Sequence, residues 1–171
     1  MFRILILIII FLAFSYGGYA YGEKFNKRYK NLKEILKNIL LLQNEIVYNM
    51  TPLPEALQSI GMKCRTPIKE LVLDSSHLLS EGKEDSVYDA FKHIYEKENN
   101  FYLNRDDERV LEDFLKSLGE LGVYGQEKMF NLVISNLNIN IKEAEIELNK
   151  NIKLYRYLGV CIGGMILIFL L

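Results

Sequence analysis

The chain is poor in the residues from which most catalytic and metal sites are built. Among 171 residues there are two cysteines and two histidines. His77 and His93 have no cysteine or histidine companion at ligand spacing, which argues against a metal site. Cys161 lies in an apolar run and Cys64 in polar sequence, so we expect no disulfide between them. This cysteine usage fits a reducing compartment.

An excess of charge of one sign is also lacking. The formal net charge of −1 argues against nucleic acid as a partner. There is no glycine-rich phosphate loop, and no serine or cysteine nucleophile stands with a histidine in a recognisable frame. The paired carboxylates of Asp106 and Asp107 fall in the first turn of an expected helix, where capping accounts for them. We therefore expect a chain that is not an enzyme and that has no cofactor.

A long hydrophobic run stands near the beginning of the chain. Ile4 to Gly22 is an uncharged run of 19 residues preceded by Arg3, close to the roughly 20 residues of a spanning helix. Tyrosines at its end suit a membrane interface. We predict a transmembrane helix over residues 1–22. The alternative is a signal peptide cleaved after the small-x-small sequence Gly18-Tyr19-Ala20, which would leave a secreted or surface helical domain with a C-terminal anchor.

A second uncharged run covers residues 157–171. As a helix it spans about 22 Å, which is short for a hydrocarbon core of about 30 Å. The span reaches adequate depth if Tyr155 joins it and Arg156 extends its charged head toward the interface. We predict a transmembrane helix over 154–171; the alternative is a buried core helix, but the run has no polar face.

Residues 23–153 have helical periodicity throughout, and no segment alternates like a strand. Two long heptad seams stand out, the first from Phe25 to Met50 and the second after Gly125. Their apolar or seam positions are Tyr29, Leu32, Leu36, Ile39, Gln43, Ile46 and Met50, and then Phe130, Ile134, Leu137, Ile141, Ala144 and Leu148. Because both long helices lead into predicted spans, we expect an all-α fold, roughly a six-helix bundle with a long antiparallel helical stalk.

Four shorter helices are expected between the long ones. Thr51 has the chemistry of an N-cap and Pro52 suits the first helical position of a helix that Gly61 ends. Pro67 opens the next, which stops near Gly82.

The other two short helices carry capping signals of their own. Ser86 and Asp89 form a capping-box-like pair before Val87 to Tyr95. Asn104, followed by acidic residues, starts the last of the four.

Positive charge predicts the orientation in the membrane. Ten Lys and Arg residues flank the inner ends of the two runs, against Arg3 alone on the other side. They are Lys24, Lys27, Arg28, Lys30, Lys33, Lys37, Lys142, Lys150, Lys153 and Arg156. We expect the helical domain, residues 23–153, to face the cytoplasm.

Several short motifs, in this order along the chain, resemble a known family. They are Glu45-Ile46-x-Tyr48, Thr51-Pro52-Leu53-x-Glu55-Ala56, Leu118-Gly119-x-Leu121-Gly122, Gln126-x-Lys128 and Leu158-Gly159. Together with two terminal apolar runs, they resemble the stage III sporulation protein AB family of endospore-forming bacteria. Two departures are the absence of tryptophan, with Phe91 and Tyr95 the nearest aromatics in the fourth helix, and Val123-Tyr124-Gly125 where an acidic cap is usual.

The resemblance implies a component of the sporulation channel apparatus between mother cell and forespore, in the mother-cell membrane. It implies a soluble part similar to the cytoplasmic F domain of type II secretion platforms. The partners that it implies are the cytoplasmic ATPase, stage III sporulation protein AA, and other channel subunits. Self-association is a further possibility that the sequence leaves open.

Two turns are our candidate partner-binding surface, because turns on rigid scaffolds commonly carry binding residues and a tyrosine beside a charge is a frequent anchor. The residues are Glu45, Tyr48, Thr51, Pro52, Leu53, Glu55, Gly119, Gly122, Gln126 and Lys128. The alternative is a structural corner without a partner. The antiparallel stalk is expected to bring both turns to its distal end.

Glycines in the two runs are candidates for close helix packing in the membrane. The pairs Gly18 and Gly22, and Gly159 and Gly163, each leave a groove on one helix face. Because the runs are expected to be antiparallel, the grooves fall at similar depth, and we predict a packed hairpin. The alternative is that glycines are simply common in membrane helices.

Overall fold

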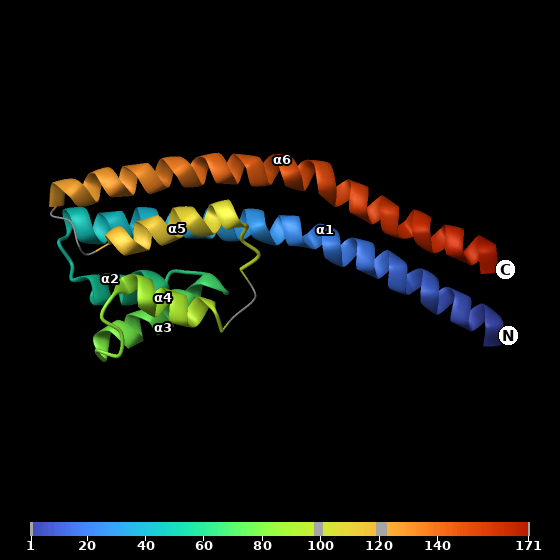
Figure 1. The fold of residues 1–171 in the computed structure, drawn as a ribbon, viewed down its shortest axis with the longest axis horizontal. Coiled ribbons are helices and arrows are strands. Elements are labelled where there is room, and N and C mark those ends of the chain that lie inside the picture. Colours follow the sequence, from blue (N-terminus) through green and yellow to red (C-terminus); the bar gives the residue numbers. More distant parts are fainter. Residues whose placement is uncertain (1, 98–100, 119–122, 171) are drawn as a thin grey trace. The chain divides into compact units, whose positions relative to one another are not determined.

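The computed structural model describes the backbone of residues 2–97, 101–118 and 123–170, and the side chains of residues 8–97, 101–118 and 125–169. Within these ranges the chain forms six α-helices, one π-helical turn and no strand, as expected for an all-α fold (Figure 1). The elements are α1 (Phe2–Gln43), η1 (Asn44–Tyr48), α2 (Leu53–Gly61), α3 (Ile68–Ser80), α4 (Val87–Tyr95), α5 (Arg105–Ser117) and α6 (Val123–Leu170).

The chain divides into two compact units. One comprises Met1–Tyr29 and Glu143–Leu171, and the other is Lys30–Lys142. Within Lys30–Lys142, α2 packs against α3, α3 against α4, and α4 against α5 (Figure 1). The largest fully buried side chains of this unit include Leu32, Leu57, Phe101 and Phe130.

The first heptad seam is shifted from its expected positions. The buried residues of α1 in this unit are Leu32, Ile35, Asn38, Ile39 and Leu42. Leu32 and Ile39 were expected there, but Leu36, Gln43 and Ile46 are only half-buried. The seam is shifted because the neighbouring helices are packed against the face that carries the residues four before and three after Ile39.

The expectation that one helix runs to Met50 is wrong. Helix α1 ends at Gln43, and a π-helical turn follows. Met50 has a φ of 53°, in the left-handed region, and its side chain is 74% exposed. An extra residue in the π turn rotates the chain that follows, so Met50 leaves the seam.

The second seam keeps its seven-residue repeat, but the second buried position of each repeat is one residue earlier than expected. Phe130, Leu137 and Ala144 are buried as expected. Between them Val133 and Asn140 are buried, whereas Ile134 and Ile141 are half-buried. The buried stripe therefore steps three residues and then four, where a step of four and then three was expected.

Capping of the short helices follows the sequence signals in two cases. The hydroxyl of Ser86 accepts from the backbone N–H of Asp89, 3.0 Å away, at the start of α4. Asn104 and Asp107 form a reciprocal capping box at the start of α5. The Asp107 side chain is fully buried and also accepts from Nδ2 of Asn140, at 3.0 Å, so the cap ties α5 to α6.

The start of α2 differs from the expectation. Thr51 is not the N-cap: Pro52 holds that position without a side-chain capping bond, and the helix begins at Leu53. The proline therefore does not occupy the first helical position; Pro54 lies in the first turn instead. The Thr51 hydroxyl is engaged elsewhere, as described below.

The unit formed by Met1–Tyr29 and Glu143–Leu171 holds the ends of α1 and α6. In this unit the two helix ends run in opposite directions, because the contacting residues have rising numbers along α1 and falling numbers along α6. Phe11 lies near Gly163, Gly18 near Gly159 and Gly22 near Ile152. Arg28, almost fully buried, contacts Glu147 with 2.6 Å between Nη1 and Oε2.

Among the residues with described side chains, one helical segment, Gly125–Phe169, is long and apolar enough to cross a membrane. Its most apolar window has a mean hydropathy of 1.6. The predicted first span, 1–22, falls partly on side chains 1–7, which lie outside the described residues.

Candidate partner-binding turns and membrane glycines

The turn between α1 and α2 is held by Glu45. Its carboxylate Oε2 accepts from the side chains of Asn49 and Thr51, each at 3.1 Å. Its backbone carbonyl accepts from the N–H of Thr51 at 2.9 Å. Hydrogen bonds from these two side chains hold the pKa of Glu45 below its ordinary value, and the bond from Asn49 has the larger effect. Glu45 thus carries its charge at neutral pH and fixes the shape of the turn.

The same turn exposes large apolar side chains to solvent. Tyr48 is 66% exposed, and Met50 next to it is 74% exposed. Pro52 and Glu55 are also exposed, while Leu53 is half-buried. Ala56 and Leu57 are buried in the core. The exposed surface of the turn is therefore formed by the aromatic ring of Tyr48 and the thioether of Met50, with the carboxylates of Glu45 and Glu55 close by in sequence.

The second turn is described only in part. Gly119 and Gly122 lie outside the described residues. Gln126 is half-buried and Lys128 is exposed in the first turns of α6. Nε2 of Gln43 donates to Oδ1 of Asn131 at 3.4 Å, which brings the end of α1 to the beginning of α6. The described residues of both turns therefore lie at the same end of these two helices within Lys30–Lys142.

Gly18 and Gly159 lie against each other in the other unit. A Cβ on Gly18 would stand 2.5 Å from the carbonyl oxygen of Tyr155 and 2.8 Å from Cα of Gly159. A Cβ on Gly159 would stand 2.9 Å from the carbonyl oxygen of Phe14. Neither position has room for a side chain without movement of backbone.

The outer glycines of the two pairs are less tightly packed. A Cβ on Gly22 would meet Ile152 at 3.4 Å, which is ordinary contact. A Cβ on Gly163 would meet the ring of Phe11 at 3.1 Å. The close approach is therefore centred on Gly18 and Gly159.

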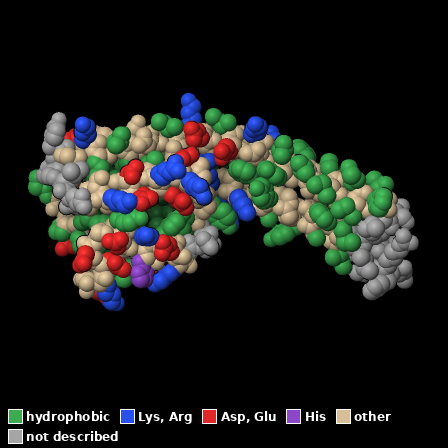
Figure 2. All heavy atoms as spheres, viewed as in Figure 1, with side chains coloured by type: hydrophobic (Ala, Val, Ile, Leu, Met, Phe, Trp, Pro, Cys, Tyr) green, Lys and Arg blue, Asp and Glu red, His purple; other side chains and the backbone are tan. Residues whose placement is uncertain are grey.

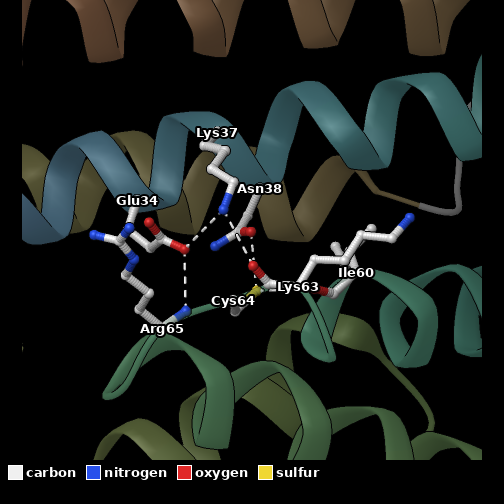
Figure 3. Close-up of polar contacts among 7 residues, drawn as sticks. All are labelled: Glu34, Lys37, Asn38, Ile60, Lys63, Cys64 and Arg65. Atoms are coloured by element: carbon white, nitrogen blue, oxygen red, sulfur yellow. Dashed lines mark hydrogen bonds and ion pairs between the residues drawn. The ribbon is translucent and has the colours of Figure 1, made fainter.

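A polar cluster that the sequence reasoning missed joins α1 to the loop after α2 (Figure 3). The Cys64 thiol donates to Oδ1 of Asn38 at 2.9 Å and also lies 3.1 Å from the carbonyl oxygen of Ile60. Oε1 of Glu34 accepts from the backbone N–H of Arg65 at 3.0 Å. Lys37 donates to the carbonyl oxygen of Lys63 at 3.1 Å. The one signal in the sequence is the spacing of Asn38, three residues after Ile35 and four before Leu42, on the buried face.

The thiol of this cluster is not poised for nucleophilic chemistry. Burial raises the pKa of Cys64 to about 11, and the negative charge of the nearby Glu34 carboxylate contributes to the rise. Because the thiolate is the reactive form, the side chain stays protonated and inert at neutral pH. What the described turns offer chemically is contact surface: exposed apolar side chains and fixed charges.

Comparison with known proteins gives one consistent result. The family model for stage III sporulation protein AB matches residues 3–171. The chain is 27% identical over 172 residues to stage III sporulation protein AB of Bacillus subtilis (strain 168), covering 100% of this chain and 99% of that protein. A solved structure of stage III sporulation protein AB (SpoIIIAB) superposes with a TM-score of 0.65 and 26% identity, over 71% of this chain and 95% of the solved one. These likenesses support a role in sporulation, and the chain belongs to the stage III sporulation protein AB family.

Proposed function

We propose that this chain is a non-catalytic membrane component of a sporulation channel between mother cell and forespore, which couples or scaffolds a cytoplasmic ATPase to that channel. Membership of the family supports the sporulation role. The ATPase that the proposal names is stage III sporulation protein AA. In this arrangement both ends of the chain are anchored in the mother-cell membrane, and residues 23–153 form a cytoplasmic domain with a long antiparallel stalk.

The observation that carries the membrane arrangement is the exposure of large apolar side chains in the unit formed by the two ends. Ile8, Ile9 and Leu12 are 51%, 56% and 59% exposed. Met165, Ile168 and Phe169 are 71%, 77% and 90% exposed. Contiguous apolar surface of this kind is rare on soluble monomers and favourable in lipid.

Aromatic side chains mark where such a membrane would end. The ring of Tyr155 lies 4.5 Å from that of Tyr21 and 5.8 Å from that of Phe25, measured between centroids. The guanidinium of Arg156 stands over the ring of Tyr19 at 4.8 Å. Aromatic rings with a cationic neighbour are characteristic of the headgroup region. This supports an interface near residues 19–25 and 155–156.

The partner surface of the proposal is the turn that exposes Tyr48 and Met50, together with Gln126 and Lys128 of α6. Tyrosine anchors are enriched in protein interfaces, and methionine adapts to irregular partner surfaces. Glu45 holds the turn rigid, so little conformational freedom is lost on binding. A fixed turn with exposed anchors favours the partner surface over the alternative of a structural corner.

Topology can be tested with the complete chain in cells. A single cysteine at Lys97→Cys, with Cys64 and Cys161 replaced by serine, should react with a permeant maleimide and be protected from an impermeant one added outside. Labelling from outside would contradict the cytoplasmic domain and favour the secreted alternative. The mass of the mature protein distinguishes that alternative independently, because cleavage after Ala20 removes the first run.

The functional part is tested by complementation. A Bacillus subtilis strain without its own homologue should sporulate when this chain is supplied, and an affinity tag on the chain should capture the ATPase from sporulating cells. Sporulation with no ATPase captured, even after in-cell crosslinking, would contradict the proposed coupling. Capture should be lost in Tyr48→Ala and kept in Met62→Ala, since Met62 is 66% exposed, as Tyr48 is, but lies at the other end of α2.

A further inference from the structure

A hollow lined by apolar side chains lies in the unit Lys30–Lys142 and opens between α4 and α5. Figure 2 shows hydrophobic side chains at its floor, with acidic and basic side chains around it. Its volume is about 320 Å³. Five helices, α1 to α5, contribute to its wall, among others through Ile39, Ile60, Val72, Phe91 and Leu111. An apolar cavity of about 150 Å³ is enough to bind benzene, so this hollow has room for a larger molecule.

The polar groups at the rim are already paired with one another. The hydroxyl of Tyr88 donates to Glu112 at 3.1 Å, and that of Tyr95 donates to Glu108 at 2.7 Å. Lys116 also donates to Glu112, at 2.6 Å. Among the described residues, the rim therefore offers no free cation to an anionic ligand, and it does not select for charge.

One wall residue has a polar group without a partner. Asn38 lines the hollow and is 5% exposed. Its Oδ1 is held by the thiol of Cys64, and its Nδ2 has no hydrogen-bond partner among the described residues. A buried amide donor without a partner is costly, and an acceptor from a ligand would remove that cost. The cationic side chain among the described lining residues is Lys92, which lies 3.9 Å from the Glu96 carboxylate and over the Tyr88 ring; because its charge is already countered, a neutral acceptor is favoured over a carboxylate.

We propose that this hollow is a binding site for a neutral, mainly apolar small molecule with one carbonyl or hydroxyl oxygen that accepts from Nδ2 of Asn38. The hydrocarbon part fills the space between α1, α4 and α5, and the oxygen satisfies the amide. The volume corresponds to roughly ten water-sized groups, at about 30 Å³ each. Such a molecule is either a free compound or the medium-length chain of a neutral monoacyl lipid. The site is independent of the membrane arrangement and of the partner turn.

The test uses the complete chain in lipid nanodiscs, with empty nanodiscs as the blank. The probes are acetophenone and α-methylstyrene, which have the same shape and differ by a carbonyl oxygen in place of a methylene group. Saturation-transfer NMR should detect binding of acetophenone to the chain. In Asn38→Leu, which keeps the number and branching of the side-chain heavy atoms, the preference for acetophenone over α-methylstyrene should fall about fivefold, the effect of one neutral hydrogen bond.

A blocking variant tests the site without touching the amide. Leu111→Trp places bulk in the hollow from α5 and should abolish binding of both probes. Leu40→Trp is its matched control, because Leu40 is 46% exposed on α1 and is not part of the wall; binding should be unchanged. Helical melting curves establish that each variant is folded, and Leu115→Trp replaces Leu111→Trp if the latter unfolds.

The outcomes separate the proposal from its alternatives. Displacement of acetophenone by 1-decanoylglycerol supports a lipid source, and its retention supports a free compound. Absence of acetophenone binding to the native chain would overturn the proposal and leave the hollow to contacts with another protein chain. An unchanged probe preference in folded Asn38→Leu would overturn the assignment of the oxygen to Asn38.

Discussion

The Thr51 hydroxyl donates to the Glu45 carboxylate across the turn that joins α1 to α2, with 3.1 Å between Oγ1 and Oε2. This bond, together with that from Asn49, lowers the pKa of Glu45 from its ordinary value. A depressed folded-state pKa contributes stability above the unfolded value, and that stability is lost as pH falls through the folded pKa. Thr51→Val, which removes only the hydroxyl, should raise the pKa of Glu45 toward 4.5, as measured by carboxyl ¹³C NMR.

The control for this prediction is Glu81, whose pKa is lowered by Lys83 rather than by a residue of this turn and should be the same in Thr51→Val and the native chain. A pKa of Glu45 that does not change in Thr51→Val would contradict the turn geometry.

The glycines of the two terminal runs allow a matched comparison. Gly18 has no room for a Cβ, whereas a Cβ on its neighbour Gly17 meets nothing within 4 Å. Gly18→Ala should therefore destabilise the pairing of the two runs by about 1–3 kcal/mol, as overpacking does. Gly17→Ala should leave the pairing unchanged.

A disulfide assay reads this pairing directly. Cysteines at Phe14→Cys and Gly163→Cys suit it, since Cβ of Phe14 lies 3.5 Å from the Cβ position of Gly163. With the native cysteines replaced, oxidation should be efficient in Gly17→Leu and weak in Gly18→Leu. Equal oxidation in the two would show that the glycine contact does not hold the runs together.

The Cys64 thiol predicts a loss of stability at alkaline pH. Its pKa is raised to about 11 in the folded chain, from an ordinary value of 9.0. A raised folded-state pKa means that the unfolded chain releases this proton first, so the free energy of unfolding falls as pH rises from about 9 to about 11. Cys64→Ser should lack that part of the fall. Urea unfolding at pH 8, 9, 10 and 11 measures the difference; parallel curves for the two chains would contradict it.

The buried contact between Asp107 and Asn140 should be costly to break. Asp107 is fully buried. Its carboxylate closes the capping box of α5 and accepts a hydrogen bond from Asn140 on α6. Asp107→Ala leaves a buried amide donor unpaired and should lower the free energy of unfolding by about 1–3 kcal/mol. Asp106→Ala is the matched control: that carboxylate is exposed and pairs with Arg109 at the surface, so its loss should be close to neutral. Equal losses for the two would contradict the role of the buried contact.

Local signals in the sequence were reliable where one residue alone decides the local structure. Asn104 and Ser86 have short side chains that reach the backbone three residues on, and both form caps as expected. Thr51 carries the same signal, but Glu45 lies close enough to take its hydroxyl. Competition from a residue six positions earlier is not visible in a capping pattern.

Packing positions were harder to predict because two neighbouring heptad registers fit the sequence. Leu36 and Ile35 are both apolar, and only the packed helices decide that Ile35 is buried. The π-helical turn at Asn44–Tyr48 then moves Met50 out of the seam. Of the candidate site, Tyr48 is exposed as a binding residue must be, whereas Asn38 and Cys64 escaped notice since a buried polar pair leaves no periodic signal.

The central proposal is that the turn carrying Tyr48 contacts a cytoplasmic ATPase, and site-specific photocrosslinking in sporulating cells tests it most directly. The crosslinking amino acid p-benzoylphenylalanine replaces Tyr48 in one strain and the equally exposed Met62 in another, each in a chain that still supports sporulation. The account predicts an adduct with stage III sporulation protein AA from position 48 and none from position 62. Absence of that adduct from position 48, or equal adducts from both positions, would contradict it.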